Sequence, residues 1–221
     1  MPSQTGKDHA ALLAHWAIAL AEDSPVLVVP WHDDAGRVAY IDLRAHPEHI
    51  HDIPEAGENP ALARVLEVLN ASGSPWATAK CDRWALDEDD LDTASFDLAL
   101  ARNRSVGHVG IGSYIDFYYR EVKEFASLEH HRELLPRLTR RAEGFDEAGV
   151  RRDGHPVVML ELTLRRCVAA GSEGYAITAF LYAIGEDAAR AQANWEAALG
   201  TLAHILLSGS AHSDRMKVAG E

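Results

Sequence analysis

The histidine-rich loop between residues 46 and 52 is the first feature of the sequence that could do chemistry. It contains His46, His49 and His51 together with Glu48 and a second carboxylate. Imidazole and carboxylate groups are usual ligands of Zn²⁺ and of other divalent metals. In an extended chain His49 and His51 would point the same way, and a turn would bring His46 back toward them. The spacing indicates a divalent metal site, although it is less diagnostic than the helical H-E-x-x-H motif, and a solvated polar loop explains the same residues.

Two strand-like segments carry polar side chains on one of their faces. Alternation puts Asp116 and Tyr118 on one face of the first segment, and it groups Glu161 with Arg165 on one face of the second. If the two faces coincide, these four side chains line a cleft that could bind a small polar ligand or transfer protons. Cross-strand ion pairing on a solvated sheet face accounts for the same pattern. The sequence leaves both interpretations open.

The chain has two cysteines, Cys81 and Cys167. A nucleophilic Cys81 would need a histidine and an acid from elsewhere in the fold. Its neighbours Lys80 and Arg83 would favour the thiolate, whereas Asp82 opposes it. A buried, inert cysteine is the commoner situation. Two cysteines are too few for a disulfide scaffold, and the sequence therefore predicts that the protein is located in the reducing cytoplasm.

Hydrophobic periodicity gives the order of the elements that would hold these residues. Helices are expected at Lys7–Glu22, Pro60–Asn70, Glu88–Asn103, Leu128–Ala142 and Glu186–Leu207. Strands are expected at Val26–Trp31, Arg37–Leu43, Trp76–Trp84, Val106–Arg120, Pro156–Val168 and Gly174–Ile184. Pro136 should kink or divide its helix because it lacks a backbone donor.

This order predicts an α+β fold with a mixed, largely antiparallel sheet of about six strands covered by helices. The second half has the β-α-β-β-α order of a ferredoxin-like unit that lacks its last strand, a comparison of element order that carries no function. We expect a single domain over residues 1–208, because no linker composition interrupts it. Residues 209–221 have little apolar content and are expected to be a disordered tail.

Charge narrows the possible partners. The chain carries 34 acidic and 21 basic residues, a formal charge of -13. This excess opposes a nucleic-acid-binding or membrane-binding surface, since both phosphates and anionic lipids attract basic proteins. The first 105 residues hold 18 acidic and 8 basic residues, so most of the negative charge lies in the first half. An acidic first half would attract a basic protein.

These observations favour a cytosolic, non-catalytic binding or regulatory protein with a basic protein partner, of which an immunity-type inhibitor is an example. The first alternative is a metal-dependent hydrolase, in which a metal on His46, His49 and His51, zinc first, polarises a substrate and activates water. The second alternative is a sensor of a small polar ligand held on the polar strand faces. The sequence does not decide whether the protein is an enzyme, and it leaves homo-oligomer formation open.

Overall fold

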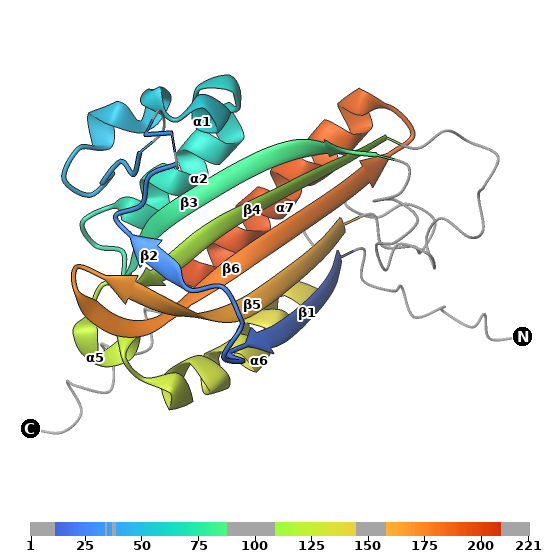
Figure 1. The fold of residues 1–221 in the computed structure, drawn as a ribbon. Helices are drawn as coiled ribbons and strands as arrows, with labels where there is room; N and C mark the ends of the chain where they lie inside the picture. Colours follow the sequence, from blue (N-terminus) through green and yellow to red (C-terminus); the bar gives the residue numbers. More distant parts are fainter. Residues whose placement is uncertain (1–11, 34, 37–38, 88–108, 145–157, 209–221) are drawn as a thin grey trace, which may run out of the picture.

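A mixed six-stranded sheet forms the centre of the molecule (Figure 1). The computed structural model describes residues 12–33, 35–36, 39–87, 109–144 and 158–208. The strands are β1 (Leu12–Ala19), β2 (Leu27–Val29), β3 (Trp76–Leu86), β4 (Val109–Tyr119), β5 (Val158–Ala169) and β6 (Ser172–Gly185). Their order is β1-β5-β6-β4-β3, and β2 pairs with the far end of β5. β1 and β2 run parallel to β5, and all other pairs are antiparallel.

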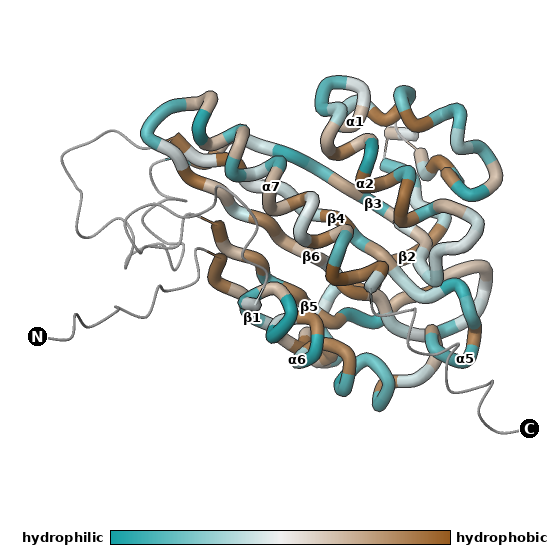
Figure 2. The backbone as a smooth tube through the Cα atoms, turned by 180° about the vertical axis from the view of Figure 1, so that it is seen from behind, coloured by the Kyte–Doolittle hydropathy of each residue, from teal (hydrophilic) through white to brown (hydrophobic). Residues whose placement is uncertain are grey.

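Helices cover one face of this sheet. The helices on this face are α2 (Pro60–Asn70), α6 (Leu128–Gly144) and α7 (Ala188–Leu207). Figure 2, seen from behind, shows α2, α6 and α7 on this face. The short helices are η1 (Pro47–Asp52), α1 (Pro54–Glu58) and α5 (Val122–Phe125), and Phe125 of α5 packs in the core on the opposite face. The predicted α+β class with a mostly antiparallel mixed sheet against helices is therefore confirmed, whereas the ferredoxin-like order of the second half stays a prediction.

The main core lies between the sheet and these helices. Every second side chain of a strand points to the same face, and in β4 and β5 these positions hold Ile115, Phe117, Leu160 and Leu162, all 0% exposed. Trp195 of α7 is also fully buried, and its Nε1 donates a hydrogen bond to Ser113 Oγ at 2.8 Å. Burial of a large aromatic ring with its polar atom satisfied anchors α7 to the middle of the sheet.

A smaller core lies on the opposite face, which we call the front face because it is turned to the viewer in Figure 1. There Val29 of β2 packs with Tyr118, Phe125 and Cys167. This cluster is built on one end of β4, β5 and β6, where β2 joins β5. The remaining part of the front face carries the polar residues that the sequence singled out.

Local sequence preferences predicted most of the elements after residue 60. The helix Pro60–Asn70 is confirmed with both ends, and Pro60 occupies its first turn. The two long strands at the end of the chain are joined by Ala170 and Gly171, both with positive φ (49° and 78°), as a tight hairpin turn requires. Pro136 lies inside α6, which continues as a single helix, so Pro136 does not divide it, and the alternative of a kink stays a prediction.

Two expectations near the beginning of the chain are wrong. The segment from residue 12 is strand β1 and not a helix, because parallel pairing with β5 overrides its helical spacing. The expected hairpin between residues 26 and 43 is reduced to an isolated bridge, His32 with Ala39, and β2 pairs with β5 instead. The helix expected at Glu88–Asn103 and the tail expected at residues 209–221 lie outside the described residues.

No helix in the described ranges is long and apolar enough to cross a membrane.

Asn70 joins α2 to the strand that carries the candidate site. It is 6% exposed, its Nδ2 donates to Leu66 O (2.8 Å) and Thr78 Oγ1 (2.7 Å), and its Oδ1 accepts from Thr78 N (3.0 Å). Asn70→Ala leaves these buried groups unpaired and should lower the free energy of unfolding by about 1–3 kcal/mol, measured by urea denaturation. The exposed Ser72→Ala is the control and should change it by less than about 0.5 kcal/mol. Equal effects of the two substitutions would contradict this role.

Candidate functional site

The structure brings the two polar strand faces together, with β6 between them. Asp116 of β4 lies opposite Thr178 of β6, which lies opposite Thr163 of β5. Two residues further along the strands, on the same face, Tyr118 and Arg165 lie on either side of Ala176. Their side chains therefore share the front face.

A cavity of about 270 Å³ on the front face contains two of the four predicted residues, Asp116 and Arg165. We call it the Asp116 cavity; it is lined by Pro25, Val26, Leu27, Lys80, Tyr114, Asp116, Arg165, Thr178 and Phe180. The other two predicted residues have different surroundings. Tyr118 is 6% exposed and packs against Phe125 in the smaller core, with ring centroids 5.7 Å apart. Glu161 Oε1 accepts a hydrogen bond from Thr163 Oγ1 at 2.8 Å.

Asp116 is a buried acid, 5% exposed. Its Oδ1 accepts a hydrogen bond from Thr178 Oγ1 at 2.5 Å. Burial raises the pKa of the Asp116 carboxyl, and the hydrogen bond from Thr178 and the charges of Arg165 and Lys80 offset only part of that rise. The charged form of Asp116 is thus disfavoured by its surroundings.

Aromatic rings hold the two cations of this cavity. Lys80 Nζ lies 5.0 Å from the ring centroid of Trp31, and the Arg165 guanidinium carbon lies 5.6 Å from that of Phe180. Among the described residues, neither cation forms an ion pair with a carboxylate. The buried Arg165 Nε has no hydrogen-bond partner in that part of the chain.

Lys80 joins this group because of a bulge in β3. The register of β3 against β4 shifts between Thr78 and Lys80, which places Lys80 opposite Asp116. Uninterrupted alternation would put Ala79 there and turn Lys80 to the helix side. Trp31 Nε1 donates to Ala79 O at 2.7 Å, so the bulged residue also holds the indole in place. Sequence reasoning missed Lys80 because nothing in the residue pattern marks the bulge.

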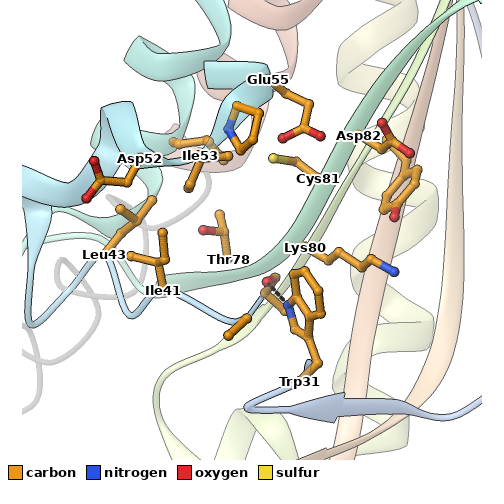
Figure 3. A pocket seen from close by; sticks show the side chains of 15 residues that line it. Trp31, Ile41, Leu43, Asp52, Ile53, Glu55, Thr78, Lys80, Cys81 and Asp82 are labelled. Carbon is orange, nitrogen blue, oxygen red and sulfur yellow. Dashed lines mark hydrogen bonds between the residues drawn. The ribbon is translucent and has the colours of Figure 1, made fainter. Parts of the chain in front are cut away.

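A second cavity, of about 570 Å³, lies beside β3 at the edge of the sheet (Figure 3). We call it the edge cavity. Its apolar wall includes Trp31, Ile41, Leu43, Ile53 and Leu66, and its polar lining includes Asp52, Glu55, Thr78, Lys80, Cys81 and Asp82. Lys80 and Tyr114 line both cavities. Figure 3 shows the side chains of Glu55 and Cys81 pointing toward each other from α1 and β3.

The pKa of Cys81 reflects the burial and the charges around the edge cavity. Burial and, to a smaller extent, the nearby carboxylates of Glu55, Asp82 and Asp116 together raise the pKa of the Cys81 thiol to about 12. A nucleophilic cysteine needs the opposite shift, so at neutral pH Cys81 is a protonated thiol and not an activated nucleophile. Burial likewise raises the pKa of Cys167 to about 12. The carboxylates that disfavour the thiolate would attract a cation.

The histidine loop is a 3-10 helix, η1, and not an extended chain. Three residues per turn align His46 with His49 and separate both from His51. Ligand atoms of His46, Glu48 and His49 lie within 4.8 Å of one another, and all three residues are exposed. His49 Nδ1 is hydrogen-bonded to Asp52 Oδ2 at 2.5 Å, and this bond raises the pKa of His49. The potential metal ligands that converge in the structure are therefore His46, Glu48 and His49, with Glu48 in place of the predicted His51.

Comparisons with family models, with curated proteins and with solved structures find no match to this chain.

The raised pKa of Asp116 makes stability depend on pH in a defined direction. Because the folded-state pKa is above the unfolded one, ionised Asp116 destabilises the fold fully above the folded pKa; this penalty declines as the pH falls below the folded pKa and is gone below the unfolded pKa. Asp116→Asn removes the charge and retains Oδ1 as an acceptor for Thr178. Its free energy of unfolding should exceed that of the wild type at neutral pH, and the difference should close in acid.

Urea denaturation at a series of pH values measures this difference. Glu67→Gln, on the exposed side of α2, removes the same charge and serves as the control. If Asp116→Asn is less stable than the wild type at neutral pH, or if the difference widens in acid, burial is not the main influence on the pKa of Asp116.

Proposed function

We propose that the protein is a non-catalytic binding protein whose edge cavity receives a cationic side chain of a basic protein partner. The observation that carries the proposal is the composition of this cavity, an apolar wall with three carboxylates, Asp52, Glu55 and Asp82, against one cation. A lysine or arginine side chain has the complementary form, because its stem is apolar and its head is charged. A guanidinium can also donate paired hydrogen bonds to a carboxylate.

The distribution of charge along the chain supports a basic partner. The first 105 residues carry 18 acidic and 8 basic residues, and the residues that line the edge cavity all belong to this part except Tyr114. An acidic surface around the binding cavity accelerates the capture of a basic partner and makes association sensitive to salt. An immunity-type inhibitor of a basic protein is one example of this class.

The position of β3 supports a partner segment beside the cavity. β3 is the last strand of the sheet among the described residues. Arg83 N–H, in the middle of β3, donates to the carboxylate of its neighbour Asp82 (2.7 Å). The edge of a sheet offers its backbone groups to an extended segment of a partner, and side-chain pockets next to that edge then select the sequence.

Butylguanidinium and its neutral isostere butylurea test the charge preference of the edge cavity. Butylguanidinium should raise the melting temperature in proportion to its binding to the folded state, and butylurea should have a much smaller effect. Glu55→Gln should weaken butylguanidinium binding about tenfold, because a charge-assisted hydrogen bond is lost. Glu58→Gln, an exposed residue of the same helix outside the cavity lining, should bind as the wild type does.

Equal stabilisation by both compounds, or unchanged binding in Glu55→Gln, would overturn the proposal.

A second candidate function is metal-dependent hydrolysis at η1. The specific observation in its favour is that Asp52 holds His49 Nδ1, while His49 Nε2 lies 3.9 Å from Glu48 Oε1. A carboxylate that orients one ring nitrogen and leaves the other for a metal is the usual arrangement around metal-binding histidines. A bound Zn²⁺ would supply Lewis-acid chemistry and an activated water, and His46, Glu48 and His49 would hold it.

Zinc binding to the untagged protein, measured by calorimetric titration, tests this second candidate. His49→Ala should abolish stoichiometric binding, whereas His51→Ala should retain it, because His51 lies outside the group of converging ligand atoms. The absence of stoichiometric binding in the wild type would remove this candidate, and an equal loss in both variants would contradict the assignment of ligands.

A further inference from the structure

We infer that the Asp116 cavity is a separate ligand site, for a small carboxylate that carries an apolar group and a hydrogen-bond donor. This inference goes beyond the proposed function, since it concerns the other cavity and a ligand of opposite charge. It rests on the juxtaposition of Lys80, Arg165 and Asp116 around one open cavity.

The two cations are the reason for choosing a carboxylate. Lys80 and Arg165 come from β3 and β5, on either side of β4 and β6, and both line the same cavity. Neither has a carboxylate partner among the described residues, and the buried Arg165 Nε lacks an acceptor there. A buried guanidinium donor without an acceptor is costly. A ligand carboxylate between the two cations would pair with both charges, the ammonium of Lys80 and the guanidinium of Arg165.

The walls of the cavity define the rest of the ligand. Val26, just before β2, and Leu27, the first residue of β2, border it on one side. The rings of Tyr114 and Phe180, whose centroids are 6.0 Å apart, border it from the sheet. Such walls favour an aliphatic or aromatic group. The volume of about 270 Å³ is just under the range of about 300–1,000 Å³ that is usual for drug-sized ligands, so the ligand is small.

Asp116 gives the site its third specificity element. Only its Oδ1 is engaged, by Thr178, and its Oδ2 makes no hydrogen bond with another described residue. A hydroxyl or amino group next to the ligand carboxylate would donate to this oxygen. The donor would also stabilise the charged form of Asp116 that burial disfavours. A carboxylate with a donor on the neighbouring carbon therefore fits the three polar groups together.

Mandelate has these three features, namely a carboxylate, an adjacent hydroxyl and a phenyl ring, and it is the probe for this site. Millimolar mandelate should raise the melting temperature, whereas mandelamide, which lacks the charge, should not. Phenylacetate, which lacks the hydroxyl, should give a smaller shift. Arg165→Gln and Lys80→Gln should each weaken mandelate binding about tenfold. Arg140→Gln, an exposed charge on α6, is the matched control and should bind as the wild type does.

The same measurement on Glu55→Gln separates this site from the edge cavity, because that variant should lose butylguanidinium binding and retain mandelate binding. Lys80 is exposed, so its substitution tests the site even if Arg165→Gln fails to fold. The inference is overturned if mandelate gives no shift, if mandelamide shifts the melting temperature equally, or if Lys80→Gln binds mandelate as the wild type does.

Discussion

Strand β6 forms antiparallel ladders with β4 on one side and with β5 on the other, and the rest of the structure depends on this double pairing. Because side chains alternate along each strand, the pairing assigns every residue of three long strands to one of two faces. One face is apolar and is covered by α2, α6 and α7. The other face brings Asp116, Thr178 and Arg165 from three strands into one region. A shift of one residue in either ladder would exchange the faces and would place Asp116 among the core leucines.

The bulge in β3 adds the second constraint. It turns Lys80 to the front face, opposite Asp116, and it exposes the carbonyl of Ala79 to the indole of Trp31. Lys80 lies between two cavities of different character, one bordered by carboxylates and one containing a second cation. We propose that this single lysine separates a region that attracts cations from a region that attracts anions. This separation underlies the assignment of two ligand classes to neighbouring cavities.

The sequence was most informative where local and long-range preferences agree. Helix α2 has one apolar stripe and a proline in its first turn, and both of its ends were predicted correctly. The segment from Leu12 to Ala19 has apolar residues at helical and at strand spacing, and only the pairing with β5 decides between them. For the site, alternation grouped Asp116 with Tyr118 and Glu161 with Arg165, and the observed strand order then puts Asp116 and Arg165 on a common face. Alternation could not predict that Tyr118 is covered by the smaller core, because that core combines Phe125 of α5 with Val29 of β2, which is far away in the sequence.

The histidine loop shows the same dependence on backbone conformation. Extended geometry aligns His49 with His51, whereas the observed 3-10 turn aligns His46 with His49 and with Asp52. Spacing of histidines predicts a ligand set only when the backbone conformation is known. The bulge at Ala79 and this turn are both backbone irregularities, and each of them changes which side chains meet.

The central claim is that the edge cavity selects cations. A proton–nitrogen correlation NMR spectrum of the tryptophan indole N–H groups tests it most directly, because Trp31 lines this cavity while Trp195 is fully buried against Ser113. With butylguanidinium, the Trp31 Nε1–H signal, assigned through Trp31→Phe, should shift in a saturable manner while that of Trp195 stays in place, and butylurea should move neither. A Trp31 signal that does not respond to butylguanidinium, or that responds equally to butylurea, would contradict the claim.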